Sequence, residues 1–381
     1  MATVTAYNLG NADTTRIDLN NGKKLLVDYA DMRCKTNPDD KRVDLPAQLL
    51  KDLTDNKRDY YDIVAFTHLD NDHICGSTKF FYLLHNAQYQ GAGRIHIKEM
   101  WVPAAAILEK ADECNEEAKI LRAEAQYRLK KGEGIRVFSN PGKLDDWLKR
   151  RQIDPASRKH LITDAGNLIP GFSLTADGVE FFVHSPFASR SNEGALIERN
   201  SDALTFQATF EEYGRKTRMH FFSDIDWEVV KYIVRVTRNR AKKDASRLDR
   251  LKWDVFHLPH HSSAYSLSAD KGKDITVPDP DIKELFEVYG EYNGIMISPS
   301  DEILTIDTIQ PPHRQAANYY RSVAKLKSGT YLVTMEQPTT GSPKPLVIQI
   351  DRFGATVKKD TGGSSAAVIG SQISPRAGSR F

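Results

Sequence analysis

The sequence predicts an α/β fold from three observations. Segments with the alternating pattern of strands occur along most of the chain, and segments with helical composition lie between them. The apolar run at residues 63–66 has the length and flanks of a short buried strand, and imidazole and carboxylate side chains follow it directly. With 381 residues, 40% hydrophobic and 27% charged, the chain is sufficient for one large domain with insertions or for two modest domains.

The N-terminal part predicts a strand hairpin, a third strand and a helix. Residues 4–8 and 15–19 alternate in polarity, and the Asn-Asn-Gly sequence at residues 20–22 is a hairpin turn signal. Residues 24–28 then return as a third strand, and residues 41–56 look helical.

A block at residues 104–166 has helical composition. Residues 104–131 are rich in Ala, Glu, Lys, Leu and Arg, which predicts one long helix that ends at Gly132. Shorter helices are predicted at residues 143–151 and 155–161. The block is interpreted as a helical insertion, which either caps the candidate site or is a solvated decoration.

The rest of the chain predicts strands, one helix and a basic stretch. The strands are expected at residues 179–184, 203–210, 218–222 and 253–256, and the helix at residues 227–238. Residues 235–252 are basic; contact with phosphate is one explanation, and a solvated helix face is the default. Gly, Ser and Ala dominate residues 361–381, which predicts a flexible tail after a single domain at residues 1–360.

Charge and hydropathy exclude several classes of protein. The net charge of +2 gives no overall excess for nucleic-acid binding. No apolar stretch reaches the roughly 20 residues that span a bilayer, and the N-terminus lacks the features of a secretory signal. Cys34, Cys75 and Cys114 form no disulfide framework and suit a reducing compartment. We therefore expect a cytoplasmic protein without a membrane segment; its protein partners stay open.

The most informative motif follows the strand at residues 63–66. Residues 67–73 read Thr-His-Leu-Asp-Asn-Asp-His. Imidazole and carboxylate groups are ligands for Zn²⁺, Mn²⁺ and Fe²⁺, and burying four of them without a cation would be costly. The alternative is a polar turn with solvated side chains. The motif predicts a metal site with the ligands His68, Asp70, Asp72 and His73.

This HxDxDH pattern, followed by Gly76, resembles the HxHxDH signature of the metallo-β-lactamase superfamily. The Asp in the second position is similar to the β-lactamase-like domain of DNA-uptake competence channel proteins, of which this chain would be a soluble stand-alone relative. Further matches occur in order at residues 8–14 (an early VGQGD loop), 221–224 (a bridging Asp), 258–263 (a PHHGS element) and, more weakly, 311–313 (a late HP site). Ala12, Cys75 and Ser262 replace glycines of that pattern, which leaves substrate specificity open.

The resemblance implies a four-layer αβ/βα sandwich with a dinuclear metal site at one edge of its two sheets. It implies that His68 and Asp70 bind the first ion, that Asp72 and His73 bind the second, and that Asp28 ends a strand beside them. The other implied ligands are Asp224 as the bridge, His260 in preference to His261 at the second ion, and His184 as either a third ligand of the first ion or a structural residue.

Other side chains would act on water or substrate. Asp72 or Asp13 would orient the attacking water, and His261 would face the leaving oxygen or a phosphate. The groups expected to orient the substrate are Asn200, Ser201, Ser262, Ser263 and His313, although Asn and Ser are more common as turn residues.

Asp70 also bears on the choice of metal. A carboxylate in place of an imidazole makes the first site more anionic and moves its preference from Zn²⁺ toward Mn²⁺ or Fe²⁺. Two such ions could hold a phosphate oxygen and lower the pKa of a shared water, whose hydroxide would attack phosphorus. The leading hypothesis is a phosphodiesterase or nuclease with two divalent ions, Zn²⁺ or Mn²⁺ or else Fe²⁺, acting on nucleic acid or another phosphodiester.

Three alternatives stay open. The first is a hydrolase of a small ester, lactone or thioester on the same site; an apolar pocket would favour it, and a basic groove would favour a phosphodiester. The second is redox chemistry at a di-iron centre. The chain shows no flavin-binding domain, which argues against this alternative. The third is a binding protein that has lost activity, against which the near-complete ligand set argues.

Overall fold

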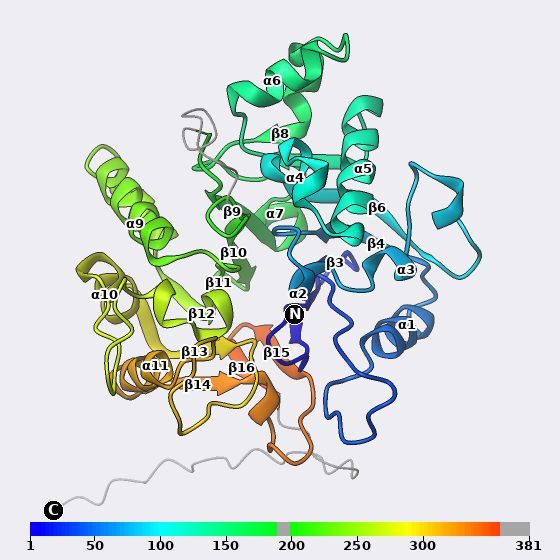
Figure 1. Cartoon of the computed structure of the whole chain (residues 1–381). Coiled ribbons are helices and arrows are strands. Elements are labelled where there is room, and N and C mark those ends of the chain that lie inside the picture. Colours follow the sequence, from blue (N-terminus) through cyan, green and yellow to red (C-terminus); the bar gives the residue numbers. More distant parts are fainter. Residues whose placement is uncertain (189–198, 359–381) are drawn as a thin grey trace, which may run out of the picture.

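The computed structural model describes residues 1–188 and 199–358, which form two β-sheets packed face to face with helices on both outer faces (Figure 1). This is the α/β, four-layer αβ/βα sandwich expected from the sequence and its resemblance. The predicted flexible tail at residues 361–381 lies outside the described residues.

The first sheet is mixed and has ten strands within the described residues. They are β1 (Ala2–Ala6), β2 (Thr15–Asp18), β3 (Lys24–Val27), β4 (Tyr60–Ala65), β5 (Phe81–Tyr82), β6 (Ile95–Pro103), β7 (Ile135–Phe138), β8 (Ile162–Thr163), β15 (Leu346–Asp351) and β16 (Gly354–Val357). Their order is β16-β15-β1-β2-β3-β4-β6-β7-β8, and β5 pairs with β6. The neighbours from β3 to β8 are parallel, so their carboxyl ends share one edge of the sheet.

The second sheet has six strands in the described part of the chain. They are β9 (Val179–Ser185), β10 (Thr205–Glu212), β11 (Arg215–Phe221), β12 (Trp253–His257), β13 (Gly290–Ser298) and β14 (Thr330–Val333), in the order β14-β13-β12-β11-β10-β9. β11 to β14 are parallel, and loops at their carboxyl ends meet those of the first sheet.

Helices cover the outer face of each sheet. Those on the first sheet are α1 (Leu45–Asp55), α2 (Asn71–Ile74), α3 (Ser77–Phe80), α4 (Ala104–Leu108), α5 (Glu116–Lys131) and α6 (Gly142–Lys149). Those on the second are α9 (Trp227–Ala241), α10 (Pro280–Glu287) and α11 (Arg314–Leu326), while α7 (Leu174–Asp177) lies beside β9 and β10. No helix in residues 1–188 or 199–358 has the length and apolar character needed to cross a bilayer.

Three apolar cores hold the four layers together. The middle core lies between the sheets, and two outer cores lie between each sheet and its helices. The alternation of side chains along a strand assigns each residue to one face. In β9, Phe181 and Val183 belong to the middle core, whereas Phe182 and His184 lie on the outer face beside α9.

The predicted long helix at residues 104–131 is wrong, because it is divided into α4 and α5. Asn115 starts α5: its side chain accepts a hydrogen bond from the Ala118 N–H at 2.8 Å. The block at residues 104–166 also adds β7 and β8 to the first sheet, so it is not wholly helical. The expected strands before and after the block, and α1 and α9, are confirmed with small changes of bounds.

The basic stretch at residues 235–252 is not one helix. α9 ends at Ala241, and a short 3₁₀ segment (Ala245–Arg250) follows it. Arg238 pairs with Asp281 and Glu284 on α10, and Arg250 pairs with Glu180 at 2.7 Å. Much of this charge therefore joins elements of the fold instead of forming a phosphate-binding face.

Candidate metal centre

The loop that follows β4 is fixed by the end of its neighbour β3. The Thr67 N–H donates to Asp28 Oδ1 at 2.7 Å, and the Thr67 hydroxyl donates to Asp28 Oδ2 at 2.7 Å. Ser223, at the end of β11 in the other sheet, donates to the Thr67 hydroxyl oxygen at 2.8 Å. These bonds join the two sheets at the edge that carries the histidine and aspartate motif.

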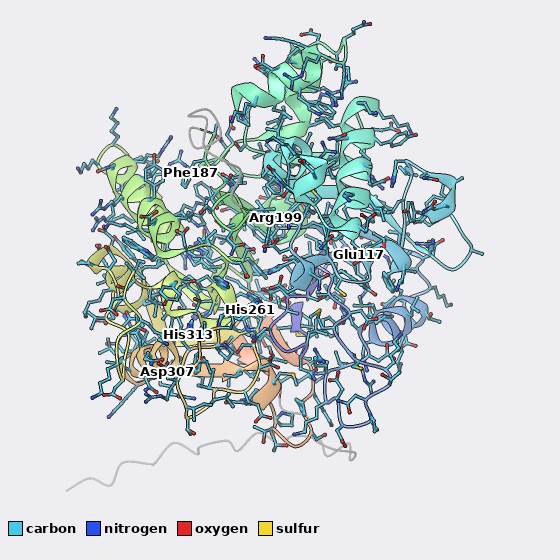
Figure 2. All side chains as sticks on the ribbon, in the orientation of Figure 1. Glu117, Phe187, Arg199, His261, Asp307 and His313 are labelled. Carbon is cyan, nitrogen blue, oxygen red and sulfur yellow. The ribbon has the colours of Figure 1, made fainter. Side chains whose placement is uncertain are left out.

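Four of the predicted site residues converge at this edge. Ligand atoms of Asp72, His73, Asp224 and His261 all lie within 4.8 Å of one another. Asp224 Oδ1 is 3.3 Å from His73 Nε2, and Asp224 Oδ2 is 3.4 Å from His261 Nε2. His261 Nε2 is also 3.0 Å from Asp72 Oδ2. Figure 2 shows His261 near the centre of the molecule, where loops from both sheets meet.

His68 and Asp70 extend this cluster toward the surface. His68 Nε2 is 3.6 Å from Asp70 Oδ2, and the imidazole centroids of His68 and His73 are 4.0 Å apart. Asp70 is partly exposed and accepts a hydrogen bond from Arg199 Nη1 at 2.6 Å. Together with the cluster, these two residues bring six side chains that carry metal-ligating atoms to this edge.

The donor atoms fit divalent cations. Nε2 of His68, Nε2 of His73 and Oδ1 of Asp224 are buried, and none has a hydrogen-bond partner among the described residues. A cation between these atoms would satisfy them, since buried polar atoms are normally paired. Imidazoles with carboxylates suit Zn²⁺, and the additional carboxylate of Asp70 suits Mn²⁺.

Charges within the cluster shift the pKa values of its buried groups. Burial lowers the pKa of His73 and of His261, but the surrounding carboxylates, Asp224 foremost among them, together outweigh burial and raise both pKa values well above the usual range. Burial would raise the pKa of Asp72, yet His73 and His261 lower it to about 2. Imidazolium protons thus balance the carboxylates here, and bound metal ions would replace those protons.

Groups behind the histidines set their ring orientation. His73 Nδ1 donates to Asp28 Oδ2 at 2.8 Å, and His261 Nδ1 donates to the Pro299 carbonyl at 2.7 Å. Each bond leaves Nε2 facing the cluster, as a metal-binding histidine requires. Asp28 was implied by the resemblance, whereas nothing in the sequence around Pro299 could identify its carbonyl.

The paired histidines occupy different positions relative to the cluster. Residues His260, His261 and Ser262 are left-handed, with φ of 49°, 52° and 62°, so the two imidazoles point in different directions. His261 is buried against Asp72 and Asp224. His260 is partly exposed, and its Nε2 is 4.0 Å from Asp224 Oδ2. His261, and not the preferred His260, therefore lies in the cluster, and which of the two binds a metal ion stays a prediction.

His184 lies apart from the metal centre. Its ring is on the outer face of β9, 5.1 Å from the His220 ring and 5.7 Å from the Phe222 ring, centroid to centroid. Because side chains alternate along a strand, a residue next to the inward-facing Val183 cannot reach the cluster. The prediction that His184 binds the first ion is therefore wrong.

Asp13 supports the cluster from behind. Its backbone N–H donates to the Asp72 carbonyl at 3.0 Å, and its Oδ1 is 3.2 Å from His257 Nε2. The carboxylate is buried and lines a small cavity with His257 and Phe221 instead of the open cleft. The predicted orientation of water by Asp13 therefore does not fit this geometry, and Asp72 is the aspartate that lies in the cluster.

A cleft of about 620 Å³ opens beside the cluster. Asn200 and Ser201, both predicted to orient the substrate, line it, and Ser201 Oγ donates to Asp226 Oδ2 at 2.8 Å. The lining residues are Asp70, Glu109, Glu113, Arg199, Asn200, Ser201, Asp224, Asp226, His260 and Tyr265.

Three residues predicted to touch substrate serve the fold instead. Ser262 is buried and donates to Ser298 Oγ at 2.7 Å, while Ser263 caps a short 3₁₀ turn. His313 Nδ1 accepts from the Ala264 N–H at 3.0 Å, and the His313 ring is buried. Their side chains do not line the cleft, so these predictions are wrong.

The block at residues 104–166 reaches the cleft through Glu109 and Glu113. Arg199 joins this block to the metal loop, with Nε donating to Glu109 Oε1 at 2.5 Å and Nη1 to Asp70. Its Nη2 also donates to the Glu113 carbonyl at 2.9 Å. Figure 2 shows Arg199 beneath the helices of this block. The block therefore contacts the cleft wall, and whether it caps the site stays a prediction; sequence reasoning missed Arg199 and both glutamates.

No family model matches the chain, and no curated protein matches it. Several solved structures are similar in fold. A diphosphatase of the PhnP family is 10% identical, with 87% of each chain covered and a TM-score of 0.30. Zinc-bound PqqB from Methylobacterium extorquens is 10% identical over 87% of this chain and 97% of its own, with a TM-score of 0.33. A class B3 di-zinc metallo-β-lactamase from an Alaskan soil metagenome is 13% identical over 72% of this chain and 84% of its own, with a TM-score of 0.26.

These likenesses concern the fold alone, and at such TM-scores they add no weight to an argument about activity. The two sheets and three cores themselves give the α/β, four-layer architecture that the resemblance implies. The closer resemblance to competence channel domains stays a prediction.

Proposed function

We propose that this protein is a hydrolase that uses two divalent metal ions to cleave a phosphodiester bond. The observation that carries the proposal is the convergence of six side chains from both sheets: His68, Asp70, Asp72, His73, Asp224 and His261. Buried imidazole nitrogens that face carboxylates without hydrogen bonds are suited to cations.

The residues divide into two adjoining ligand groups. Asp224 presents one oxygen toward His73 and the other toward His261, which suits a carboxylate shared by two ions. His68 and Asp70 would hold the ion nearer the cleft, and Asp72, His73 and His261 would hold the inner ion.

Groups beside the ligands would supply the rest of the chemistry. When bound, two divalent ions activate a water molecule and neutralise the charge on a phosphate oxygen. His260 lines the cleft, where its imidazole can donate a proton to the leaving oxygen. Arg199 lines the same cleft, held by Glu109 and Asp70, and its guanidinium suits a non-bridging phosphate oxygen.

The charge of the cleft favours a compact substrate. Ions bound at the cluster would neutralise the carboxylates next to them, but Glu109, Glu113 and Asp226 lie on the wall. Carboxylates at that position repel a long polyanion. We therefore expect a small phosphodiester to be a better substrate than DNA or RNA.

The same acidic wall supports a second candidate function, hydrolysis of a small ester, lactone or thioester. Such substrates carry no phosphate charge, so Glu109, Glu113 and Asp226 would not oppose them. Arg199 distinguishes the two candidates, because a guanidinium on the wall favours an anionic substrate.

The test begins with metal content and activity. Chelator-treated protein is reloaded with Mn²⁺ or Zn²⁺ and assayed on bis(p-nitrophenyl) phosphate, single- and double-stranded DNA, RNA, p-nitrophenyl acetate and a lactone. The variant Asp72→Ala/His73→Ala is compared with Asp112→Ala/His160→Ala, which makes the same chemical change at two exposed residues.

Three results are informative. Metal-dependent cleavage of the diester that is lost only in Asp72→Ala/His73→Ala would support the proposal. Bound metal with ester or lactone hydrolysis, but without diester cleavage, would move the assignment to the second candidate. A protein that binds no metal would overturn both.

A further inference from the structure

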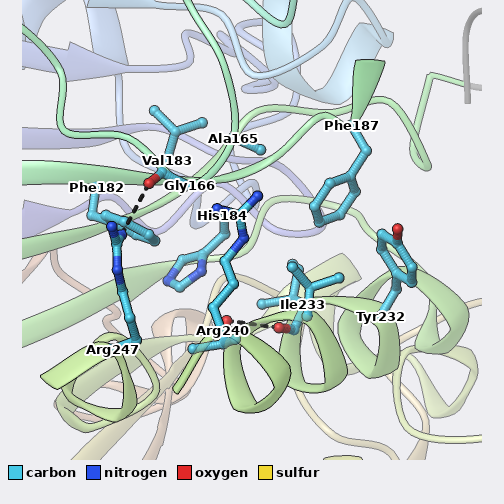
Figure 3. A pocket seen from close by; sticks show the side chains of 12 residues that line it. Ala165, Gly166, Phe182, Val183, His184, Phe187, Tyr232, Ile233, Arg240 and Arg247 are labelled. Atoms are coloured by element: carbon cyan, nitrogen blue, oxygen red, sulfur yellow. Dashed lines mark hydrogen bonds between the residues drawn. The ribbon is translucent and has the colours of Figure 1, made fainter. Parts of the chain in front are cut away.

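A second pocket, lined by residues other than those of the metal cleft, lies beneath α9 against the outer face of β9. Its volume is about 130 Å³. Figure 3 shows Phe182, Phe187, Tyr232 and Ile233 on its walls, with His184 among them. The Phe187 and Tyr232 rings meet edge to face, with centroids 4.6 Å apart. The walls are thus mainly aromatic and aliphatic.

Arg240 gives this apolar pocket a positive end, and Arg247, which pairs with Asp244 at 3.4 Å, lies beside it. Arg247 Nη1 donates to the Gly166 carbonyl at 3.2 Å, as Figure 3 shows. The Arg240 guanidinium lies over Gly166, about 3.9 Å from where a Cβ would sit. It has no hydrogen-bond or ion-pair partner within residues 1–188 and 199–358, and no carboxylate among them lines the pocket. An unpaired guanidinium beside aromatic walls is suited to an anion.

His184 adds a polar atom inside the pocket. Its side chain is 3% exposed, and its Nε2 has no hydrogen-bond partner among the described residues. Burial lowers the pKa of His184 well below its usual value, so the imidazole is neutral. A buried, unpaired imidazole nitrogen needs a partner that the protein does not supply, and a bound molecule could provide it.

We propose that this pocket binds a small organic anion, namely a single apolar ring or short acyl chain that carries one carboxylate or phosphate group. The ring or chain would lie against Phe182, Phe187 and Ile233. The anionic group would bind both Arg240 and His184. The volume agrees, because a protein cavity of about 150 Å³ holds one benzene molecule. This site is separate from the proposed metal centre and does not depend on it.

The test uses chelator-treated full-length protein, so that no metal ion can bind the probes. Benzoate and phenyl phosphate are the test probes; benzyl alcohol supplies the ring without the charge, and inorganic phosphate supplies the charge without the ring. Calorimetric titration should show saturable binding of one equivalent of benzoate or phenyl phosphate. Both partial probes should bind at least about 10-fold more weakly, because each lacks one of the two interactions.

Variants locate the binding. Arg240→Gln should weaken benzoate binding about 10-fold or more, whereas Lys242→Gln, which also removes a positive charge but lies outside the pocket lining, should leave it unaltered. Ala165→Leu should block the pocket from a different wall. The proposal would be overturned if neither anion binds, if benzyl alcohol binds as tightly as benzoate, or if Arg240→Gln and Ala165→Leu both bind benzoate like the unaltered chain.

Discussion

Two pairs of buried histidines in this molecule respond to burial in opposite directions. His73 and His261 lie at the metal centre, and His184 and His220 lie on the outer face of the second sheet; none is more than 3% exposed. Burial lowers the pKa of the first pair, but the carboxylates around it, Asp224 foremost, together raise that pKa well above the usual range. Burial lowers the pKa of His184 well below its usual value and that of His220 to about 3.

The difference comes from the neighbours of each pair. Carboxylates on the loops at the sheet edge face the first pair, whereas the second pair contacts aromatic rings such as Phe222. A buried histidine in this fold therefore indicates a cation site only where a carboxylate accompanies it. This explains why His184, which ends a strand as a ligand would, does not belong to the metal centre.

The largest expected effect separates the adjacent residues His260 and His261. His261→Ala removes an imidazole that contacts Asp72 and Asp224, so metal affinity should fall by more than about 100-fold and activity with it. His260→Ala keeps the ligand set, so metal content should persist while turnover falls by about 100-fold. Elemental analysis of both proteins, with circular dichroism to verify folding, measures this. Equal loss of metal in the two variants would contradict the assignment.

A smaller effect is expected from the carboxylate behind the cluster. Asp28→Asn keeps the shape of the side chain but weakens its bond to His73 Nδ1. Metal affinity should fall by about 10- to 100-fold, measured by competition with a chromogenic chelator. Asp55→Asn, at an exposed position on α1, is the matched control. Equal affinities in the two variants would show that Asp28 does not orient His73.

The second pair should determine part of the acid sensitivity of the metal-free protein. The pKa of His220 is about 3 in the folded protein, whereas its ordinary value is 6.5, so the unfolded chain binds the extra proton between these values. Its contribution to the free energy of unfolding is present above pH 6.5 and is lost as pH falls below it. The free energy of unfolding of His220→Phe, relative to that of the unaltered chain, should therefore rise by up to about 1.4 kcal/mol for each pH unit below pH 6.5.

Urea unfolding of both chelator-treated proteins at about pH 7 and about pH 5 measures this gain, which follows from the different proton uptake of the folded and unfolded chains. A stability difference that does not change with pH would mean that His220 keeps an ordinary pKa in the folded protein.

The smallest effect is expected at His184. His184→Phe changes the pocket beneath α9 and leaves every member of the metal cluster in place. Metal content and affinity should stay within about twofold of the unaltered chain, because no bond joins this residue to the ligands. A large loss of metal would restore His184 as a ligand and remove the distinction between the two pairs.

The sequence was sufficient to predict the features of the fold and site that depend on local residue patterns. The HxDxDH motif keeps its ligands within one loop, and the strand before it has a clear apolar run, so His68 to His73 could be placed together. Asp224 and the paired histidines were assigned to the candidate site from the order of the motifs along the chain. The strand periodicity in β9 also contained the signal that His184 faces outward, because Val183 beside it is apolar and faces the middle core.

Other features depend on contacts that sequence spacing does not show. Arg199 meets Glu109 across 90 positions of the chain, and Glu109 lies in a bend inside a segment with the composition of one helix. The choice between His260 and His261 depended on left-handed backbone at residues that are not glycine. Ser263 and His313 bond to neighbouring backbone groups, and nothing in their sequence context separates that role from contact with substrate.

The turn at residues 260–262 has a consequence for how this protein can evolve. Left-handed backbone at residues that carry a Cβ costs about 1–2 kcal/mol each, so the surrounding fold must hold this conformation in place. Under the proposed function, adjacent residues would then carry the imidazole that binds the cations, His261, and the imidazole that acts on the reactant, His260. Natural variation at His260 could therefore change the substrate without altering the metal ligands. Insertion of one residue before His260 would disturb both the substrate contact and the metal ligands.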